Sequence, residues 1–385
     1  MHDLMLVGCS SLAVWDNKSE DGGLLIGRNF DFYANDDFAK NKIISFVKPN
    51  SGYPYMSVTW GGMIGVSSGM NLEGLTVTIN AGKSSIPLKA KTPISLVALE
   101  VLQYASTIDE AVEIAKTKKV FVSESMMIGS AKDHRVVLIE ISPKKFGVYE
   151  VSNQPYLACT NHFQSDVYSD DKRNNTQKEE SHSVYRFEKI EEHLSNENKL
   201  NPTKMVELLR DTNGLKNTKL GYGNEKALNQ LLAHHAVVFQ PDKRLVWVSS
   251  NPYQLGEFTA YDLNKIFNDS ISNYTLNVDS LRIEKDAFVL SDNYSNYEKY
   301  RKQTHEINKL IKENKKIEET FLTSYIQNNP DFWLVYDKVG DYYFQQKDYQ
   351  QASFYYKLAL TKEVTTVPDR NKIQKKLSKC SRKMR

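Results

Sequence analysis

Short apolar segments of strand length crowd the first part of the chain and most constrain its fold. Between residues 4 and 79 they alternate with turns rich in glycine, asparagine and proline. The predicted strands span residues 4–8, 11–15, 24–32, 43–47, 55–60, 63–67 and 75–79. Strands of this length at this spacing indicate a mostly antiparallel sheet.

Helices and strands then follow in blocks. Helices are predicted at 93–105 and 108–117, and Thr107 and Glu110 have the spacing of a capping box. Further on, we expect strands at 125–128, 136–141, 147–151 and 156–159, an exposed loop at 164–182, helices at 184–194 and 202–209, and strands at 236–239 and 245–249, closing near residue 262. This order favours an α+β sandwich, with sheets packed on each other and helices outside, over a doubly wound parallel sheet.

The last third of the chain has a different character. Residues 263–300 show weak periodicity and are expected to form a linker or wrapping segment, and residues 301–385 are expected to be helical. Within the helical part, residues from about 333 to 363 have the spacing of one tetratricopeptide-like repeat. A lone repeat cannot bury its own face. We therefore expect it to pack on the preceding domain or on another subunit, which leaves a homo-oligomer open.

Charge and composition exclude several classes of protein. The net charge of +3 hides a basic C-terminus, with eight Lys or Arg and no acidic residue over 370–385. No aromatic residues interleave with these charges, so a solvated helix is favoured and nucleic acid is not expected as a partner. No apolar run reaches the ~18 residues of a membrane span. Residues 1–8 are too short for a signal peptide, which predicts a cytoplasmic protein unless a further segment precedes them.

A hairpin over residues 6–32 carries a candidate nucleophile, the thiol of Cys9. If it folds about residues 19–21, Cys9 lies opposite about residue 31, among Arg28, Asn29 and Asp31. Taken alone, Cys9 is more typical of a small buried hydrophobe. The three cysteines are too few and too scattered for a disulfide framework or a thiolate metal site. No serine-hydrolase, zinc-protease or phosphate-loop motif competes with Cys9.

Cleavage of the chain before Cys9 would turn the thiol into a self-sufficient nucleophile. Gly8 permits the strained geometry that self-cleavage needs. The new α-amine of Cys9, with a reference pKa of about 8, suits a general base. Arg28 would favour the thiolate and Asp31 would orient the amine. Because Arg28 and Asp31 have opposite parity, we expect a bulge or bend near Asn29.

Several short motifs occur together in one order. They are Gly8-Cys9, Gly27-Arg28-Asn29-x-Asp31, Gly69-Met70-Asn71-x-x-Gly74 with Asn80, Thr160-Asn161, and Ser183-Val184-Tyr185-Arg186-Phe187. With weaker matches in the strands at 235–239 and 245–249, this pattern resembles the penicillin acyltransferase and choloylglycine hydrolase branch of the N-terminal nucleophile (Ntn) hydrolases over about the first 260 residues. The Asn-His at 161–162 departs from the Asn-x-Pro of bile-salt hydrolases and leans toward the acyltransferase side.

The resemblance implies a four-layer αββα fold over residues 9–262, after a propeptide of residues 1–8. It implies a small-molecule N-acyl substrate, no cofactor and no metal, with an acyl-CoA or an amine as an acceptor. Cys9 would hold the acyl group as a thioester. Asn161 and Asn80 would supply oxyanion donors, and Arg28, Asp31 and Arg186 would set the electrostatics of the thiol and the amine.

Each assignment has a structural rival. Asn80 could end a strand, Asn161 could cap a turn, and Arg186 could be a surface arginine of a helix. Two other functions stay open: a ceramidase-like lipid amidase with a larger apolar groove, and an unprocessed, inactive Ntn-like domain that binds a partner through its helical repeat. Residues 33–40, 50–62 and 162–182 are expected to supply the walls of a substrate pocket.

Overall fold

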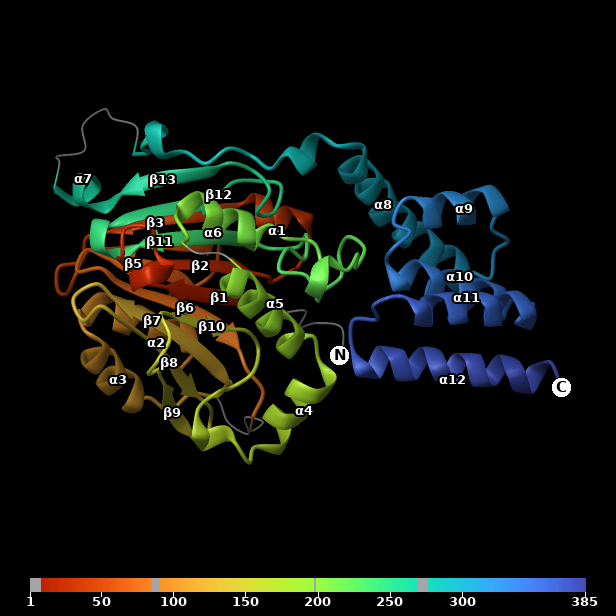
Figure 1. Cartoon of the computed structure of the whole chain (residues 1–385), viewed down its shortest axis with the longest axis horizontal. Helices are drawn as coiled ribbons and strands as arrows, with labels where there is room; N and C mark the ends of the chain where they lie inside the picture. The colour runs from red at the N-terminus through yellow and green to blue at the C-terminus, as the bar shows by residue number, and fades with distance from the viewer. Residues whose placement is uncertain (1–7, 85–90, 197–198, 269–275) are drawn as a thin grey trace.

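Two antiparallel sheets lie face to face in the main body of the protein (Figure 1). The structure is a computed structural model and describes residues 8–84, 91–196, 199–268 and 276–385. One sheet has the strand order β10-β1-β2-β11-β12-β13, and the other runs from β3 to β9 in sequence order. The strands are β1 (Ser10–Val14), β2 (Leu25–Phe30), β3 (Lys42–Val47), β4 (Tyr55–Trp60), β5 (Ser68–Asn71), β6 (Leu75–Ala81), β7 (Glu124–Ser130), β8 (Arg135–Ile141), β9 (Phe146–Tyr149), β10 (Tyr156–Cys159), β11 (His235–Gln240), β12 (Leu245–Ser249) and β13 (Phe258–Asp262).

Helices cover the outer face of each sheet. α2 (Ile94–Tyr104) and α3 (Ile108–Lys116) share a core with the seven-stranded sheet. α5 (Ser183–Asn196) and α6 (Pro202–Leu209) pack on the six-stranded sheet. Neighbouring residues of one strand serve different cores: Leu25 faces the helices, whereas Ile26 lies between the sheets. The expected αββα sandwich and the capping box at Thr107 are confirmed.

Two predictions of local structure were wrong, at residues 63–67 and 164–182. Residues 63–67 do not form a strand, because Gly65 has a φ of +105° and the chain turns there, so β5 begins only at Ser68. The expected loop at 164–182 contains α4 (Lys172–Glu180), a polar helix capped by Asp171. The expected linker at 263–300 begins with α7 (Leu263–Asn268) and ends in the first turns of α8 (Asp292–Lys312). Of the predicted strand at 4–8, only Gly8 lies within the described residues.

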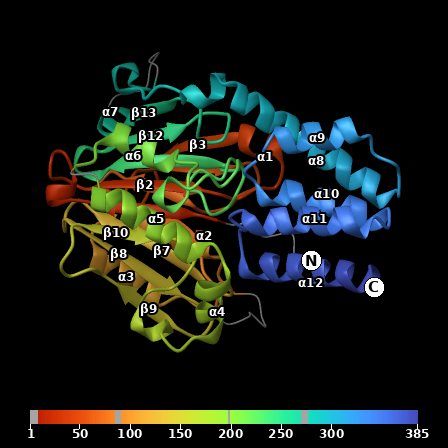
Figure 2. The same ribbon diagram turned by 45° about the vertical axis from the view of Figure 1, so that its right-hand side comes forward.

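The C-terminal helices stack beside the main body (Figures 1 and 2). They are α8, α9 (Glu319–Gln327), α10 (Trp333–Gln345), α11 (Tyr349–Thr361) and α12 (Val367–Lys383). α10 and α11 approach closely at Gly340, where an added Cβ would lie 2.6 Å from the ring of Tyr356. Ala352 and Ala359 are fully buried in the same helix pair. The tetratricopeptide-like character of this pair stays a prediction.

These helices share a hydrophobic core with the main body of the same chain. Leu231, Tyr253 and Leu255 pack with Phe332 and Trp333 in one cluster. Among the described helices, none combines the length and the hydropathy needed to cross a membrane.

Buried polar contacts also join the helices to the main body. The Nδ2 group of Asn224 donates to the carbonyl of Glu363 over 2.9 Å, and the Nδ2 group of Asn329 donates to the carbonyl of Tyr222 over 2.8 Å. The C-terminal helices thus share both an apolar core and hydrogen bonds with the main body. We therefore describe them as an integral part of the fold.

We expect a chain that ends at Asp262 to aggregate. Removal of the helices would expose the apolar side chains of Leu231, Tyr253 and Leu255, at a cost of about 25 cal/mol for each Å² uncovered. Soluble yield and size-exclusion chromatography measure the outcome, with a chain ending at Lys383 as the control. A monomeric 1–262 chain with the thermal midpoint of the full chain would contradict this expectation.

Candidate active site

The β1–β2 hairpin brings Gly8-Cys9 next to the motif that spans residues 27–31. Ser10 pairs with Asn29, and the N–H of Gly8 donates to the carbonyl of Asp31 over 3.0 Å. Cys9 is therefore level with Phe30, one residue away from the expected register. The pairing of β2 is regular through Phe30, so the bulge expected near Asn29 is absent. No bulge is needed, because Cys9 directly precedes the first residue of β1. There, side chains from both faces of the six-stranded sheet can reach it.

The guanidinium of Arg28 reaches the thiol of Cys9 from the space between the sheets. Its Nη2 lies 3.6 Å from the Cys9 Sγ, and its Nη1 donates to the carbonyl of Ser67 over 2.7 Å. Further bonds run to the Oγ of Ser68 and the carbonyl of Ile79. Both Cys9 and Arg28 are fully buried. Burial raises the pKa of the Cys9 thiol and Arg28 only partly offsets this effect, so the thiol is protonated at neutral pH in this state.

Arg186 contacts Cys9 from the side of the six-stranded sheet that the helices cover. From α5, its Nη1 donates to the carbonyl of Cys9 over 2.7 Å and to the Oγ of Ser10 over 2.8 Å. Its Nη2 donates to the Oδ1 of Asn161 over 2.6 Å. Arg186 is fully buried, which excludes the alternative of a surface arginine. Burial lowers its pKa to about 10, so it is still a cation at neutral pH.

Asp31 is a fully buried carboxyl group. Among the residues that the structure describes, neither of its side-chain oxygens has a hydrogen-bond partner. Burial raises the pKa of Asp31 to about 7, against the opposing effect of the Arg186 and Arg28 charges. A buried carboxylate without hydrogen bonds is costly, which agrees with the raised pKa of Asp31.

Asn80 and Asn161 link the two sheets behind the thiol. Asn80 accepts a hydrogen bond from the Ser11 hydroxyl over 2.8 Å, and its Nδ2 donates to the carbonyls of Cys159 and Thr160 over 3.0 and 3.4 Å. The Nδ2 group of Asn80 is thus directed at the backbone of Cys159 and Thr160. The Nδ2 of Asn161 donates to the carbonyl of Ala81 over 2.9 Å, which leaves its second N–H group available.

The structure adds residues that the sequence motifs did not single out. The carbonyl of Gly8 accepts a hydrogen bond from the Nε2 of Gln230 over 2.6 Å. The N–H of Asn161 donates to the Oγ of Ser183 over 2.7 Å, a contact that explains the serine at the start of the α5 motif. Ser68 contacts the Nε2 of His235 at 2.8 Å, so this histidine belongs to the buried network behind Arg28. No sequence pattern marks Gln230.

A cavity of about 810 Å³ opens beside this cluster. It is lined by residues 81–84 and 122–124, by α4 with Ser181, and by Thr366 and Pro368 at the start of α12. Ala81, which accepts the Asn161 hydrogen bond, and Glu124, its partner in the β6–β7 ladder, are both in this lining. Burial raises the pKa of Glu124 to about 8, opposed by the Arg28 charge. Of the expected pocket walls, only the segment 162–182 contributes.

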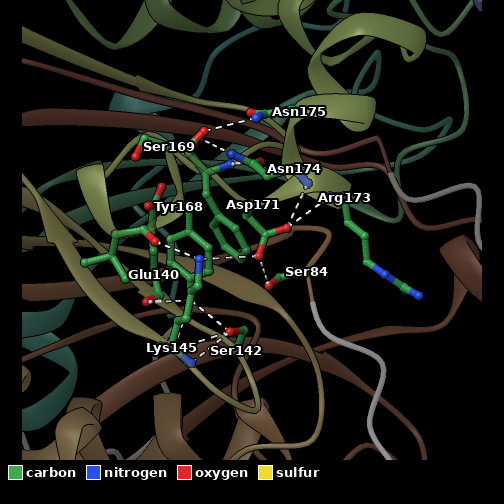
Figure 3. Close-up of polar contacts among 12 residues, drawn as sticks. Ser84, Glu140, Ser142, Lys145, Tyr168, Ser169, Asp171, Arg173, Asn174 and Asn175 are labelled. Atoms are coloured by element: carbon green, nitrogen blue, oxygen red, sulfur yellow. Dashed lines mark hydrogen bonds and ion pairs between the residues drawn. The ribbon is translucent and has the colours of Figure 1, made fainter.

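Hydrogen bonds at its N-terminus hold α4 in place as a wall of the cavity (Figure 3). The carboxylate of Asp171 accepts from the Ser84 hydroxyl over 2.6 Å and from the backbone N–H groups of Arg173 and Asn174. The Nζ of Lys145 lies 3.8 Å from the same carboxylate. The loop after β6 and the first turn of α4 are thus joined by one side chain.

Comparison with known proteins identifies the family. A sequence model described as acyl-coenzyme A:6-aminopenicillanic acid acyl-transferase matches residues 15–252, which is more than half of the chain. The chain belongs to this family. The resemblance to the penicillin acyltransferase branch of the Ntn hydrolases is thereby confirmed, and the match begins after Cys9.

Individual relatives are more distant. An uncharacterized protein of Archaeoglobus fulgidus is 27% identical over 150 residues, which cover 37% of this chain and 24% of that protein. The alignment thus spans about a quarter of that relative's length. The ortholog of N-acylethanolamine-hydrolyzing acid amidase from Caenorhabditis elegans is 20% identical with a TM-score of 0.44, covering 61% of this chain and 93% of that one. A variant of conjugated bile acid hydrolase from Clostridium perfringens is 15% identical with a TM-score of 0.43, covering 70% and 96%.

The pKa of Asp31 predicts how stability depends on pH in the uncleaved chain. Between about pH 4 and pH 7 the folded state retains a proton that the unfolded state has lost, so the free energy of unfolding falls as the pH rises. In a Cys9→Ala background, Asp31→Asn removes this titration. The double variant should therefore gain up to about 4 kcal/mol over the single variant between pH 4 and pH 8. Urea unfolding measures it; a difference that is constant or falls with pH would show an ionised, paired Asp31.

Proposed function

We propose that this protein is an autoprocessed, cysteine-nucleophile amidohydrolase or N-acyltransferase that acts on a small-molecule N-acyl substrate through a Cys9 thioester. The observation that carries the proposal is the Asp31 carboxyl group, which has no hydrogen-bond partner among the described residues and belongs to the residue that pairs with Gly8. Cleavage of the Gly8–Cys9 peptide would create a free α-amine next to this carboxyl group. A hydrogen bond from the amine to the ionised carboxyl group would lower the pKa of Asp31 and hold the amine in place, with its lone pair free to accept the thiol proton.

In the proposed reaction, the Cys9 thiol attacks the substrate carbonyl while its own α-amine accepts the thiol proton. The amine then passes this proton to the leaving group as the C–N bond breaks, and the acyl group stays on Sγ as a thioester. Water releases the acyl group by hydrolysis, or an amine acceptor takes it by transfer. Arg28, 3.6 Å from Sγ, favours the thiolate.

The developing oxyanion needs donors that are already in position. We assign one to the free N–H of Asn161, whose Oδ1 is fixed by Arg186. Asn80 then acts as a positioning residue, because its contacts to the carbonyls of Cys159 and Thr160 hold the segment that carries Asn161.

The cavity is the proposed substrate site. Ala81 in its lining is bonded to Asn161 of the thiol cluster, and Thr366 and Pro368 of the C-terminal helices also line it. We propose residues 9–262 as the catalytic domain and 263–300 as a wrapping segment, with the helices of 301–385 completing the cavity. This arrangement favours an enzyme over an interaction protein whose repeat serves only a partner.

Intact-mass spectrometry tests the cleavage. We expect the purified protein to lack residues 1–8 and Cys9→Ala to retain them, because the thiol is the attacking group. Cys380→Ala, which removes a buried cysteine of α12, is the matched control and should be processed normally. An uncleaved wild-type chain that ignores N-acyl substrates would refute the proposal and favour the inactive interaction protein.

A second test addresses the oxyanion donor. Asn161→Ala should lower kcat for an N-acyl amide by about 100-fold, since removal of one such donor costs about 3 kcal/mol of barrier. An unchanged kcat would exclude Asn161 from this role. Comparison of short-chain and long-chain N-acyl substrates in the wild-type protein separates the penicillin acyltransferase type from the ceramidase-like alternative, which requires a preference for long chains.

A further inference from the structure

We infer that Gln230 is the oxyanion donor for the cleavage of the Gly8–Cys9 peptide, a step distinct from the turnover of substrate. The inference rests on the proposed function, because it assigns a residue to the maturation of that same site. The carbonyl oxygen of Gly8 is the atom that becomes negative when Cys9 attacks its own preceding peptide. The Nε2 of Gln230 donates a hydrogen bond to this oxygen over 2.6 Å.

The contact is built into the fold. Gly8 is buried and Gln230 is 1% exposed. A Cβ atom on Gly8 would lie 2.4 Å from the Oε1 of Gln230, so any larger residue before Cys9 would push the amide away. This close approach of the Gln230 amide favours glycine at the position before Cys9.

The turn that carries Gln230 is held rigidly on both sides. The N–H of Asn229 donates to the carbonyl of Asp211 over 2.9 Å, and the Oδ1 of Asn229 accepts from the N–H of Leu231 over 3.1 Å. Leu231 has a φ of +54°, a strained conformation for a bulky residue. Its carbonyl accepts a hydrogen bond from the hydroxyl of Tyr297 in α8 over 3.3 Å. The C-terminal helices therefore help to fix the position of Gln230.

The atoms flanking the peptide bond are fixed as well. The N–H of Gly8 is bonded to the carbonyl of Asp31, and the carbonyl of Cys9 accepts from Arg186. With both neighbours immobilised, the Gly8 carbonyl is presented in one orientation, with the Gln230 amide already in place for the charge that develops there.

The Cys9 Sγ adds to the carbonyl carbon of Gly8, and Gln230 stabilises the resulting oxyanion. The C–N bond breaks and the thiol proton ends on the nitrogen, which becomes the α-amine of Cys9, while the acyl group of residues 1–8 is a thioester on Sγ. One water molecule hydrolyses this thioester, which releases the peptide with a carboxylate at Gly8 and restores the thiol.

The test follows processing during cell-free synthesis by intact mass. Gln230→Met keeps the side-chain volume but has no N–H donor, and it should slow cleavage by about 100-fold or more. Gln254→Met, a substitution of another fully buried glutamine, is the matched control and should be processed at the wild-type rate. A second pair of chains, encoded with an initiator methionine directly before Cys9, bypasses the step. There Gln230→Met should leave turnover of an N-acyl substrate within about threefold of its parent, because the donor acts on an oxygen that the mature chain has lost.

The possible results separate the two claims. An uncleaved wild-type chain overturns the proposed function, and this inference with it. Cleavage of wild type and Gln230→Met at equal rates overturns the inference alone. Loss of activity by Gln230→Met in the chain that begins at Cys9 would assign Gln230 a structural or substrate role instead, and it would also overturn the inference.

Discussion

The site depends on two buried guanidinium groups, those of Arg28 and Arg186. They approach Cys9, at the start of β1, from opposite faces of the six-stranded sheet. Arg28 approaches Cys9 from between the sheets, and Arg186 approaches it from the helix layer. A buried cation is tolerated only when its N–H groups are bonded and its charge is balanced. The partners of Arg28 are Ser67, Ser68 and Ile79, in or beside the seven-stranded sheet. The partners of Arg186 include Cys9, Ser10 and Asn161, in or beside the six-stranded sheet. The two sheets thus hold Arg28 and Arg186 in position, and these two side chains determine the electrostatic environment of the Cys9 thiol.

The balancing charge connects this constraint to the proposed cleavage. Among the described residues Asp31 has no hydrogen-bond partner, and burial raises its pKa. The cluster therefore holds two cations with an incompletely ionised acid, which is an unfavourable arrangement. A free amine at Cys9 would give the carboxylate a partner. In this account part of the driving force for cleavage is electrostatic, and it is stored in the fold before the bond breaks.

Sequence patterns were sufficient for the layers and for the identity of the central residues. Alternating apolar residues gave nearly every strand of both sheets, and the ordered motifs from Gly8 to Phe187 predicted side chains that the structure brings to one place, including Cys9, Arg28 and Arg186. The missed features have a common physical cause. Gln230 contacts Gly8 across most of the domain, and such a long-range hydrogen bond leaves no local pattern. α4 lacks an apolar stripe, so its polar sequence is indistinguishable from that of a loop.

The role of the C-terminal helices also required the structure. Their repeat-like spacing predicted an apolar surface that must pack against something else. Part of that packing surface lies in the same chain, at Leu231, Tyr253 and Leu255. Through Tyr297 they support the turn of Gln230, and through Thr366 and Pro368 they reach the cavity. We regard these helices as part of the catalytic unit.

The most direct test of the central claim is to locate the acyl group during turnover. The protein is mixed with an activated N-acyl substrate, quenched in acid and digested, and the mass of the N-terminal peptide is measured. We expect an acyl adduct on a peptide that begins at Cys9, lost on treatment with neutral hydroxylamine as a thioester would be. An adduct on Cys159 or on a hydroxyl group, in an enzyme that turns over substrate, would contradict a Cys9 thioester.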